Sequence, residues 1–287
     1  MEFVQVDVFA ESPFEGNPLA VFPEAGELSG AQMQAIAREM NLSETTFVTS
    51  TTQQESYDVR IFTPEDELGF AGHPTIGTAW VLDDLGVLKG ERFVQRSPAG
   101  PTRVTARGDR LWFEREGSSE PDLERCDPDS TARVARALGL APGDVGLEAR
   151  ELGRPGRLTP AFADAGLRQL MVPVKDLPAL GEARPRPDLL AELTILGVYC
   201  FTAVQAGRLR SRGFFPAVGI TEDPATGSAA AALGLYLASR LGSIAVEVRQ
   251  GVEMGRPSRI LLEAETGGVM VGGSCHRVLS GRTERLP

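Results

Sequence analysis

The sequence predicts an α+β fold made of two similar domains, each organised around one central helix. Short segments with strand-like patterns outnumber helical ones, and the two kinds do not alternate regularly, which argues against a doubly wound sheet. A set of short motifs occurs twice in the same order, which indicates a duplication. Two helical segments lack a charged face, and a helix that is apolar all round is surrounded by protein.

The first half of the chain opens with strand patterns. Residues 3–9 alternate with a period of two, and a Pro, Gly and Asn cluster at 13–18 is typical of a turn. Ser29 and Gln32 form a capping-box pattern before a helix that extends to Met40. Further strands are expected at 47–48, 57–62, 103–106 and 110–113, with a helix at 74–85.

The second half begins after a polar segment, 114–129, which we expect to be a linker. A short helix is predicted at 130–140, whereas the Pro- and Gly-rich stretch 141–190 shows no clear pattern. The longest helix is predicted at 224–241. Strands are expected at 195–204, 208–215, 245–249, 260–264 and 268–272.

The repeat consists of two motifs. Residues 60–64 and 212–216 share the pattern R-x-F-x-P, 152 residues apart. Residues 73–79 and 223–229 share [HD]-P-x-x-G-[ST]-A, 150 residues apart. Because both pairs occur in the same order at nearly the same offset, each half is expected to contain a strand, a turn, a loop and a proline-started helix.

The reactive residues and the charge exclude several classes of function. The chain has two histidines, three distant cysteines and two lysines, Lys89 and Lys175. These numbers disfavour multi-histidine zinc sites, disulfide frameworks and Schiff-base chemistry. A net charge of −10 argues against binding to nucleic acid or to an acidic membrane. Without a signal pattern or an apolar run of about 20 residues, a cytoplasmic location is expected.

The two repeated helix starts are candidate anion sites. His73 and Asp223 each precede a proline and are expected to hold the position just before a helix, with Asp223 as a capping residue. Gly72 and Gly227 permit close approach of a ligand to the backbone. Helix-start amides and the helix dipole bind carboxylates, although a plain capping role is the alternative.

Glu44 is the candidate acid–base residue. It lies between the end of one predicted helix and the start of the next strand. In a closed apolar cleft its pKa would rise, and the carboxyl group would serve as general base and general acid. A solvated surface glutamate is the alternative, because most glutamates are exposed.

Several stretches resemble the PhzF-like family of phenazine-biosynthesis isomerase homologues, and the resemblance covers essentially the whole chain. The matching residues are 7–9, 16–21, 41–47, 72–75, 223–229, 250–251 and 255–258. The resemblance implies a diaminopimelate-epimerase-like fold, in which a barrel-like, mostly antiparallel sheet surrounds the helix of each domain. It implies domains of 1–114 plus 275–287 and 115–274, with the site in the cleft between them, and a homodimer.

The resemblance also implies an activity. The family isomerase, trans-2,3-dihydro-3-hydroxyanthranilate isomerase, moves a double bond by proton transfer without metal or cofactor. We therefore expect a cofactor-independent isomerase of a small carboxylate-bearing metabolite, with Glu44 as the base. The resemblance assigns catalysis to Glu44, His73, Asp223 and Ser228, and substrate binding to Asn17, Ser43, Gly72 and Gly227.

Two other functions stay open on the sequence. One is a racemase, epimerase or lyase acting on an amino-acid-like substrate, and the other is a catalytically silent small-molecule-binding protein. Related epimerases carry two cysteines at the two helix starts, whereas Cys126, Cys200 and Cys275 all lie elsewhere. A two-thiol racemase is therefore disfavoured.

Overall fold

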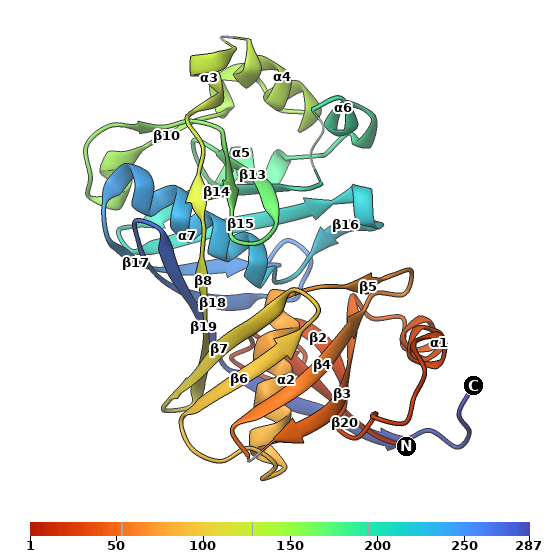
Figure 1. Cartoon of the computed structure of the whole chain (residues 1–287). Helices are drawn as coiled ribbons and strands as arrows, with labels where there is room; N and C mark the ends of the chain where they lie inside the picture. Colours follow the sequence, from red (N-terminus) through yellow and green to blue (C-terminus); the bar gives the residue numbers. More distant parts are fainter. Residues whose placement is uncertain (53, 128, 194–195) are drawn as a thin grey trace. The chain divides into compact units, whose positions relative to one another are not determined.

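A computed structural model describes residues 1–52, 54–127, 129–193 and 196–287 of the chain (Figure 1). The chain forms two compact units, Met1–Glu114 with Gly272–Pro287, and Arg115–Val271. The second unit thus ends at Val271 rather than at residue 274. Within the described residues, no helix combines the length and apolar character needed to cross a membrane.

The first unit contains a sheet and two helices. Strand β20 pairs antiparallel with β1 and β1 with β2, while β2 pairs parallel with β3. The order continues through β4, β6, β7 and β8, with β4 parallel to β6. The bounds are β1 Glu2–Val8, β2 Asn17–Phe22, α1 Gly30–Met40, β3 Glu44–Thr52, β4 Ser56–Phe62, β5 Glu67–Leu68, α2 Gly72–Asp84, β6 Arg92–Ser97, β7 Gly100–Arg107, β8 Arg110–Glu116 and β20 Cys275–Arg282.

The second unit has a comparable sheet with more helices around it. The Pro- and Gly-rich stretch that showed no clear pattern supplies β10 to β13, α5 and α6. The bounds are β9 Ser118–Ser119, α3 Leu123–Cys126, α4 Ser130–Ala137, β10 Leu147–Glu148, β11 Arg157–Leu158, β12 Ala161–Asp164, β13 Arg168–Pro173, α5 Leu177–Glu182, α6 Pro187–Glu192, β14 Val198–Gln205, β15 Arg208–Phe215, β16 Ile220–Asp223, α7 Gly227–Leu241, β17 Ile244–Gln250, β18 Ser258–Glu265 and β19 Gly268–Gly273.

Strand pairing reproduces the duplication predicted from the motifs. In the first unit, β1–β2 is antiparallel, β2–β3 parallel, β3–β4 and β4–β5 antiparallel, and β4–β6 parallel. In the second unit, β12–β13, β13–β14, β14–β15, β15–β16 and β15–β17 follow the same series. The two halves therefore share one topology, and the central helix follows the same hairpin in each.

The R-x-F-x-P motif has the same role in both units. Arg60 lies over the ring of Phe62 and forms a two-bonded ion pair with Glu67 on the next strand. In the second unit, Arg212 lies over Phe214 and pairs in the same way with Glu222. The repeated motif thus corresponds to a repeated structural unit, in which an arginine joins two strands of the hairpin before the central helix.

The two central helices are buried, as their uncharged faces predicted. Helix α2 contacts β1, β2, β3, β6, β7 and β20, and α7 contacts β9, β12, β13, β17 and β18 (Figure 1). Gly77 allows close packing in the first unit, because an added Cβ would lie 2.6 Å from Leu19 Cδ2 and 2.7 Å from Val8 Cγ2. Close packing of this kind holds the start of α2 against β1 and β2.

Helix α1 confirms the capping-box prediction. The Ser29 side chain accepts from the Gln32 amide, and the Gln32 side chain accepts from the Ser29 amide. Met33, Ile36 and Ala37 pack into a core with phenylalanines of β2, β3 and β4. The helix ends at Asn41 in a left-handed conformation, which leads directly into Ser43 and β3.

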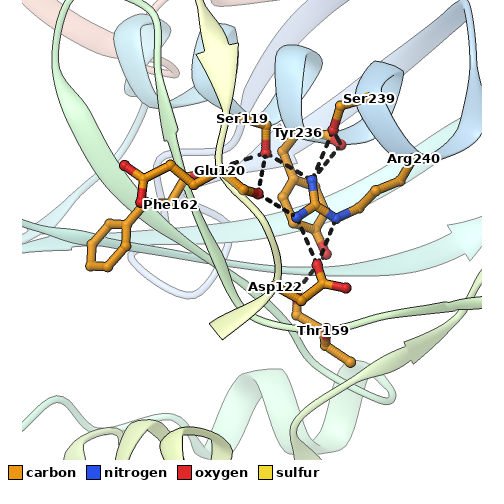
Figure 2. Close-up of polar contacts among 8 residues, drawn as sticks. All are labelled: Ser119, Glu120, Asp122, Thr159, Phe162, Tyr236, Ser239 and Arg240. Carbon is orange, nitrogen blue, oxygen red and sulfur yellow. Dashed lines mark hydrogen bonds and ion pairs between the residues drawn. The ribbon is translucent and has the colours of Figure 1, made fainter. Parts of the chain in front are cut away.

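The expected linker at 114–129 is largely structured, so that prediction is wrong. Strand β9 pairs with β12, and Arg240 near the end of α7 binds the same segment (Figure 2). The guanidinium donates to the carboxylate of Asp122, the hydroxyl of Ser119 and the carbonyl of Glu120. The polar composition of this segment suggested a linker because its hydrogen-bond partner, Arg240, lies over 100 residues away in the chain.

Candidate functional site

Three of the expected site residues lie at the beginning of neighbouring strands. Asn17 is the first residue of β2, Glu44 is the first residue of β3, and Ser43 directly precedes it. Parallel strands begin at the same edge of a sheet, and the register pairs Leu19 with Glu44. The parallel pairing of β2 and β3 therefore brings these side chains to one place.

Helix α2 adds His73 to this group. His73 is the second residue of α2, and its Nε2 lies 3.4 Å from Oε2 of Glu44. On the other side of the ring, Nδ1 lies 3.3 Å from Nδ2, the side-chain amide nitrogen of Asn17. The hydroxyl of Ser43 donates to the amide oxygen of Asn17 at 3.3 Å. Ser43, Asn17, His73 and Glu44 thus form one continuous polar chain.

Burial determines the electrostatics of this chain. The side chains of His73 and Glu44 are 5% and 11% exposed. Burial lowers the pKa of His73 from 6.5 to about 3, because a cationic ring would lose its hydration. At neutral pH the contact therefore joins a neutral imidazole to a carboxyl group and is not an ion pair.

Buried hydroxyl and amide groups fix the start of α2. Thr46 in β3 bonds to Thr78 in α2 with 2.9 Å between their hydroxyl oxygens, which joins the strand of Glu44 to the helix of His73. In the first turn, the Thr75 hydroxyl accepts from Gln95, whose side-chain oxygen accepts from Tyr57. These positioning residues were not predictable from the sequence, because a buried threonine or glutamine has no distinguishing local pattern.

The second unit holds the other expected site residues. Asp223 is the last residue of β16, Gly227 is the first residue of α7 and Ser228 is the second. Asp223 and Ser228 are buried, and a carboxylate oxygen of Asp223 accepts from the Thr226 hydroxyl at 2.5 Å. The Asp223 carbonyl accepts from the side chain of Gln250, so strand β17 holds the helix start in place.

Two details of the predicted helix starts are wrong. Asp223 lies in a strand and Thr226 holds the position before α7, so neither Asp223 nor Pro224 begins the helix. His73 lies within the first turn of α2, after Ala71. A proline was expected to mark the first helical position, but Gly72 and Gly227 begin the two helices instead. The amides of these glycines have no acceptor within their own helix.

The two halves differ in their chemistry despite their common topology. Phe47 pairs with Arg60 in the first unit, and Cys200 pairs with Arg212 in the second. Glu44 precedes Phe47 by three residues, so the equivalent position in the second unit is Gly197. The structure therefore assembles Asn17, Ser43, Glu44, His73 and Gly72 in one unit, and Asp223, Gly227 and Ser228 in the other. That both groups face one cleft remains a prediction.

Two cysteines of the described part of the chain lie in strands and are not in a disulfide. Cys200 and Cys275 are buried, and burial raises the pKa of Cys200 to about 12. Cys200 lies in β14 and Cys275 in β20, so neither residue belongs to the first turn of α2 or α7. Within the described ranges, no group of three or more His, Cys, Asp or Glu side chains is arranged to hold a metal ion.

Comparisons with known proteins identify relatives over nearly the whole chain. The chain is 38% identical to an uncharacterized isomerase of Pasteurella multocida, over 93% of this chain and 89% of that protein. It is 37% identical to trans-2,3-dihydro-3-hydroxyanthranilate isomerase of Pseudomonas aeruginosa, over 94% and 92%. A crystal structure of a Bacillus anthracis phenazine biosynthesis protein of the PhzF family superimposes with a TM-score of 0.82 at 23% identity, over 98% of both chains.

The structural match confirms the predicted fold class, a mixed α+β fold with mostly antiparallel sheets. The matched family model, PhzC-PhzF, is described as phenazine biosynthesis-like protein and spans residues 6–281. The match therefore includes every expected site residue of both units. The chain belongs to the phenazine biosynthesis-like family, PhzC-PhzF.

Proposed function

We propose that this protein is an isomerase that moves a double bond in a small carboxylate-bearing metabolite by proton transfer, with Glu44 as acid and base. One observation carries the proposal: the carboxyl group of Glu44 is almost fully buried beside the neutral ring of His73. A buried carboxyl group in a dry site is suited to act as general base and general acid. Relatives named as isomerases support the reaction class.

The proposed reaction conserves protons and electrons within the site. Glu44 takes a proton from a carbon of the substrate, and the electron pair of the broken C–H bond shifts the adjacent double bond. The carboxylic acid then returns a proton to a different carbon, which restores the Glu44 carboxylate. The reaction needs no redox partner, since substrate and product differ only in the positions of a proton and a double bond.

The helix starts supply the anion-binding part of the proposal. The amides of Gly72 and Gly227 begin buried helices, where the positive end of the helix dipole favours a carboxylate. These dipoles also stabilise negative charge that develops as the proton leaves carbon. Asp223 and Ser228, near the start of α7, are proposed to orient the substrate or to relay protons.

The direct test is a Glu44→Gln variant assayed with trans-2,3-dihydro-3-hydroxyanthranilate in deuterated water. We expect turnover of the unmodified protein and a loss of about 10²–10⁴-fold or more in the variant, the usual contribution of a general acid–base group. Glu39→Gln, on the exposed end of α1, is the matched control and should retain full activity. Retention of turnover by Glu44→Gln would overturn the assignment.

The same assay separates the alternatives. A silent binding protein would retain the compound without changing it and without exchanging deuterium into it. A racemase would exchange deuterium at one carbon and leave the double bond in place. Loss of activity counts as evidence for catalysis by Glu44 only if the circular dichroism and unfolding midpoint of the variant match those of the control.

A further inference from the structure

Ser43 and Asn17 belong to the polar chain that ends at Glu44, but their contacts differ from those of substrate ligands. The Asn17 side chain has no exposed surface, so a substrate cannot reach it without displacement of its neighbours. Its amide oxygen accepts from Ser43 and its amide nitrogen faces the ring of His73. These two contacts are to other protein groups and suit a role in positioning them.

We propose that Asn17 and Ser43 are positioning residues that hold His73 as the neutral tautomer with its proton on Nε2, directed at Glu44. The inference rests on the proposed function for its catalytic consequence. The tautomer itself follows from the orientation of the Asn17 amide in the structure.

The hydroxyl of Ser43 carries one proton. The group opposite it, Oδ1 of Asn17, is a carbonyl oxygen that only accepts, so Ser43 is the donor. In the structure the Asn17 amide is turned with its oxygen toward Ser43, and this orientation directs the NH₂ group toward His73. The proposed role of Ser43 is to hold the amide in that orientation.

The NH₂ group of Asn17 can only donate, so the ring nitrogen opposite it must accept. Nδ1 of His73 lies 3.3 Å away and therefore carries no proton. A neutral imidazole has one proton, which must then lie on Nε2, 3.4 Å from Oε2 of Glu44. A second ring proton would be placed on Nδ1 against the Asn17 donor, in a site where burial already disfavours a cation.

The consequence concerns the basic form of Glu44. An N–H group beside a carboxyl oxygen favours the carboxylate, because the positive end of its dipole faces the negative charge. The opposite tautomer would direct a lone pair at Glu44 and favour its protonated form. The chain from Ser43 to His73 thus sets the protonation state in which Glu44 begins the proposed reaction.

Nitrogen-15 NMR of the histidines tests the tautomer without any assay of turnover. The chain has only two histidines, so a His276→Gln variant labelled with [¹⁵N]histidine reports on His73 alone. We expect the signal of an unprotonated nitrogen for Nδ1 and of a protonated nitrogen for Nε2, unchanged from pH 8 to pH 5. A protonated Nδ1 in this protein would overturn the inference.

Asn17→Asp is the decisive variant, because a carboxylate in place of the NH₂ group can only accept. It should move the proton of His73 to Nδ1 or give a doubly protonated ring. Turnover should fall by about 10²-fold, as for a misplaced catalytic group, with a much smaller change in KM. Ser43→Ala removes one hydroxyl and should give a mixture of tautomers.

The outcomes separate this inference from the proposed function. An unaltered His73 signal in both Asn17→Asp and Ser43→Ala would overturn the positioning role, whatever the activity. The expected tautomer in a protein that turns over no substrate would uphold the positioning role and overturn the isomerase. If Asn17→Asp fails to fold, the His276→Gln and Ser43→Ala spectra still decide the question.

Discussion

Nε2 of His73 lies 3.4 Å from Oε2 of Glu44 at a site where burial lowers the pKa of His73 to about 3. The distance alone fits an ion pair, but a ring with that pKa is neutral at physiological pH. A cationic neighbour would stabilise the carboxylate strongly and weaken it as a base. A neutral ring beside the carboxyl group lowers its basicity less than a cation would, which suits a group that must accept and return a proton.

Buried, neutral His73 should make the protein sensitive to acid. The pKa of a histidine in the unfolded chain is about 6.5, so between pH 6.5 and about 3 the unfolded state binds a proton that the folded state does not. The free energy of unfolding should therefore fall as the pH decreases, by roughly 1 kcal/mol per pH unit from this residue. Urea unfolding at a series of pH values measures it.

The window from pH 6.5 to 5 distinguishes His73 from the carboxylates. Carboxylates with lowered pKa, such as Glu67 beside Arg60 and Glu120 beside Arg168, lose their contribution mainly at lower pH. A His73→Gln variant should have a flatter profile in this window, whereas the control His276→Gln should keep the slope. Equal slopes in His73→Gln and the unmodified protein would contradict the prediction.

Sequence reasoning reached the topology of the fold because the duplication leaves local marks. The R-x-F-x-P motif and the helix-start motif lie at nearly constant offset, and each corresponds to a hairpin followed by a buried helix. The structured segment after β8 was missed because the partner of Asp122 is Arg240, at the far end of α7. A contact between distant positions leaves no periodic pattern in the residues that make it.

The candidate site was predictable in its residues more than in its geometry. Glu44 and His73 were named from motifs, and the structure places them in contact. Asn17 was expected to bind substrate, and the structure adds that its side chain contacts Ser43 and His73. The strand position of Asp223 was not predicted, because the proline that follows it is typical of a helix start. In the structure Asp223 pairs with Gly213 in the β15–β16 hairpin.

The duplicated Arg–Glu pairs provide a stability experiment with an internal control. Arg212 and Glu222 have side chains 6% and 16% exposed, and Arg212 also donates to the carbonyls of Leu180 and Ala183. Glu222→Gln should lower the free energy of unfolding by about 3–5 kcal/mol, because it leaves a buried guanidinium without its counter-charge. Chemical denaturation measures the loss.

The matching pair in the first unit is more exposed and should matter less. The side chains of Arg60 and Glu67 are 33% and 31% exposed, with the same two-bonded geometry. Glu67→Gln should cost about 0–1 kcal/mol, since solvent screens the pair. Similar losses in the two variants would show that burial does not govern the contribution of this motif.

Arg240 should stabilise the second unit by joining the end of α7 to the segment that contains Ser119 and Asp122 (Figure 2). The guanidinium lies 3.9 Å from the centre of the Tyr236 ring and donates to Asp122 at 2.7 Å. Arg240→Met keeps much of the packing but removes the charged hydrogen bonds, with an expected loss of about 1–3 kcal/mol. Arg136→Met, on the exposed face of α4, is the control and should stay within about 0.5 kcal/mol.

Gly77 connects packing to catalysis, because it sets the distance between α2 and the strands that precede the site. In Gly77→Ala the new Cβ would lie 2.6 Å from Leu19 Cδ2 and 2.7 Å from Val8 Cγ2, both in fully buried side chains. The clash should cost about 1–3 kcal/mol of stability and push α2 away from β1 and β2. His73 would move with the helix, while Glu44 would stay with β3.

The expected result for Gly77→Ala is therefore a fall in kcat at a temperature where the variant is still folded. The change should also appear as a shifted His73 signal in the ¹⁵N spectrum, since its distances to Asn17 and Glu44 increase. Gly143→Ala is the control, because an added Cβ there meets nothing within 4 Å. A destabilised Gly77→Ala protein with normal kcat and an unchanged His73 signal would show that the helix tolerates the methyl group without moving, and that the geometry at Glu44 does not depend on this contact.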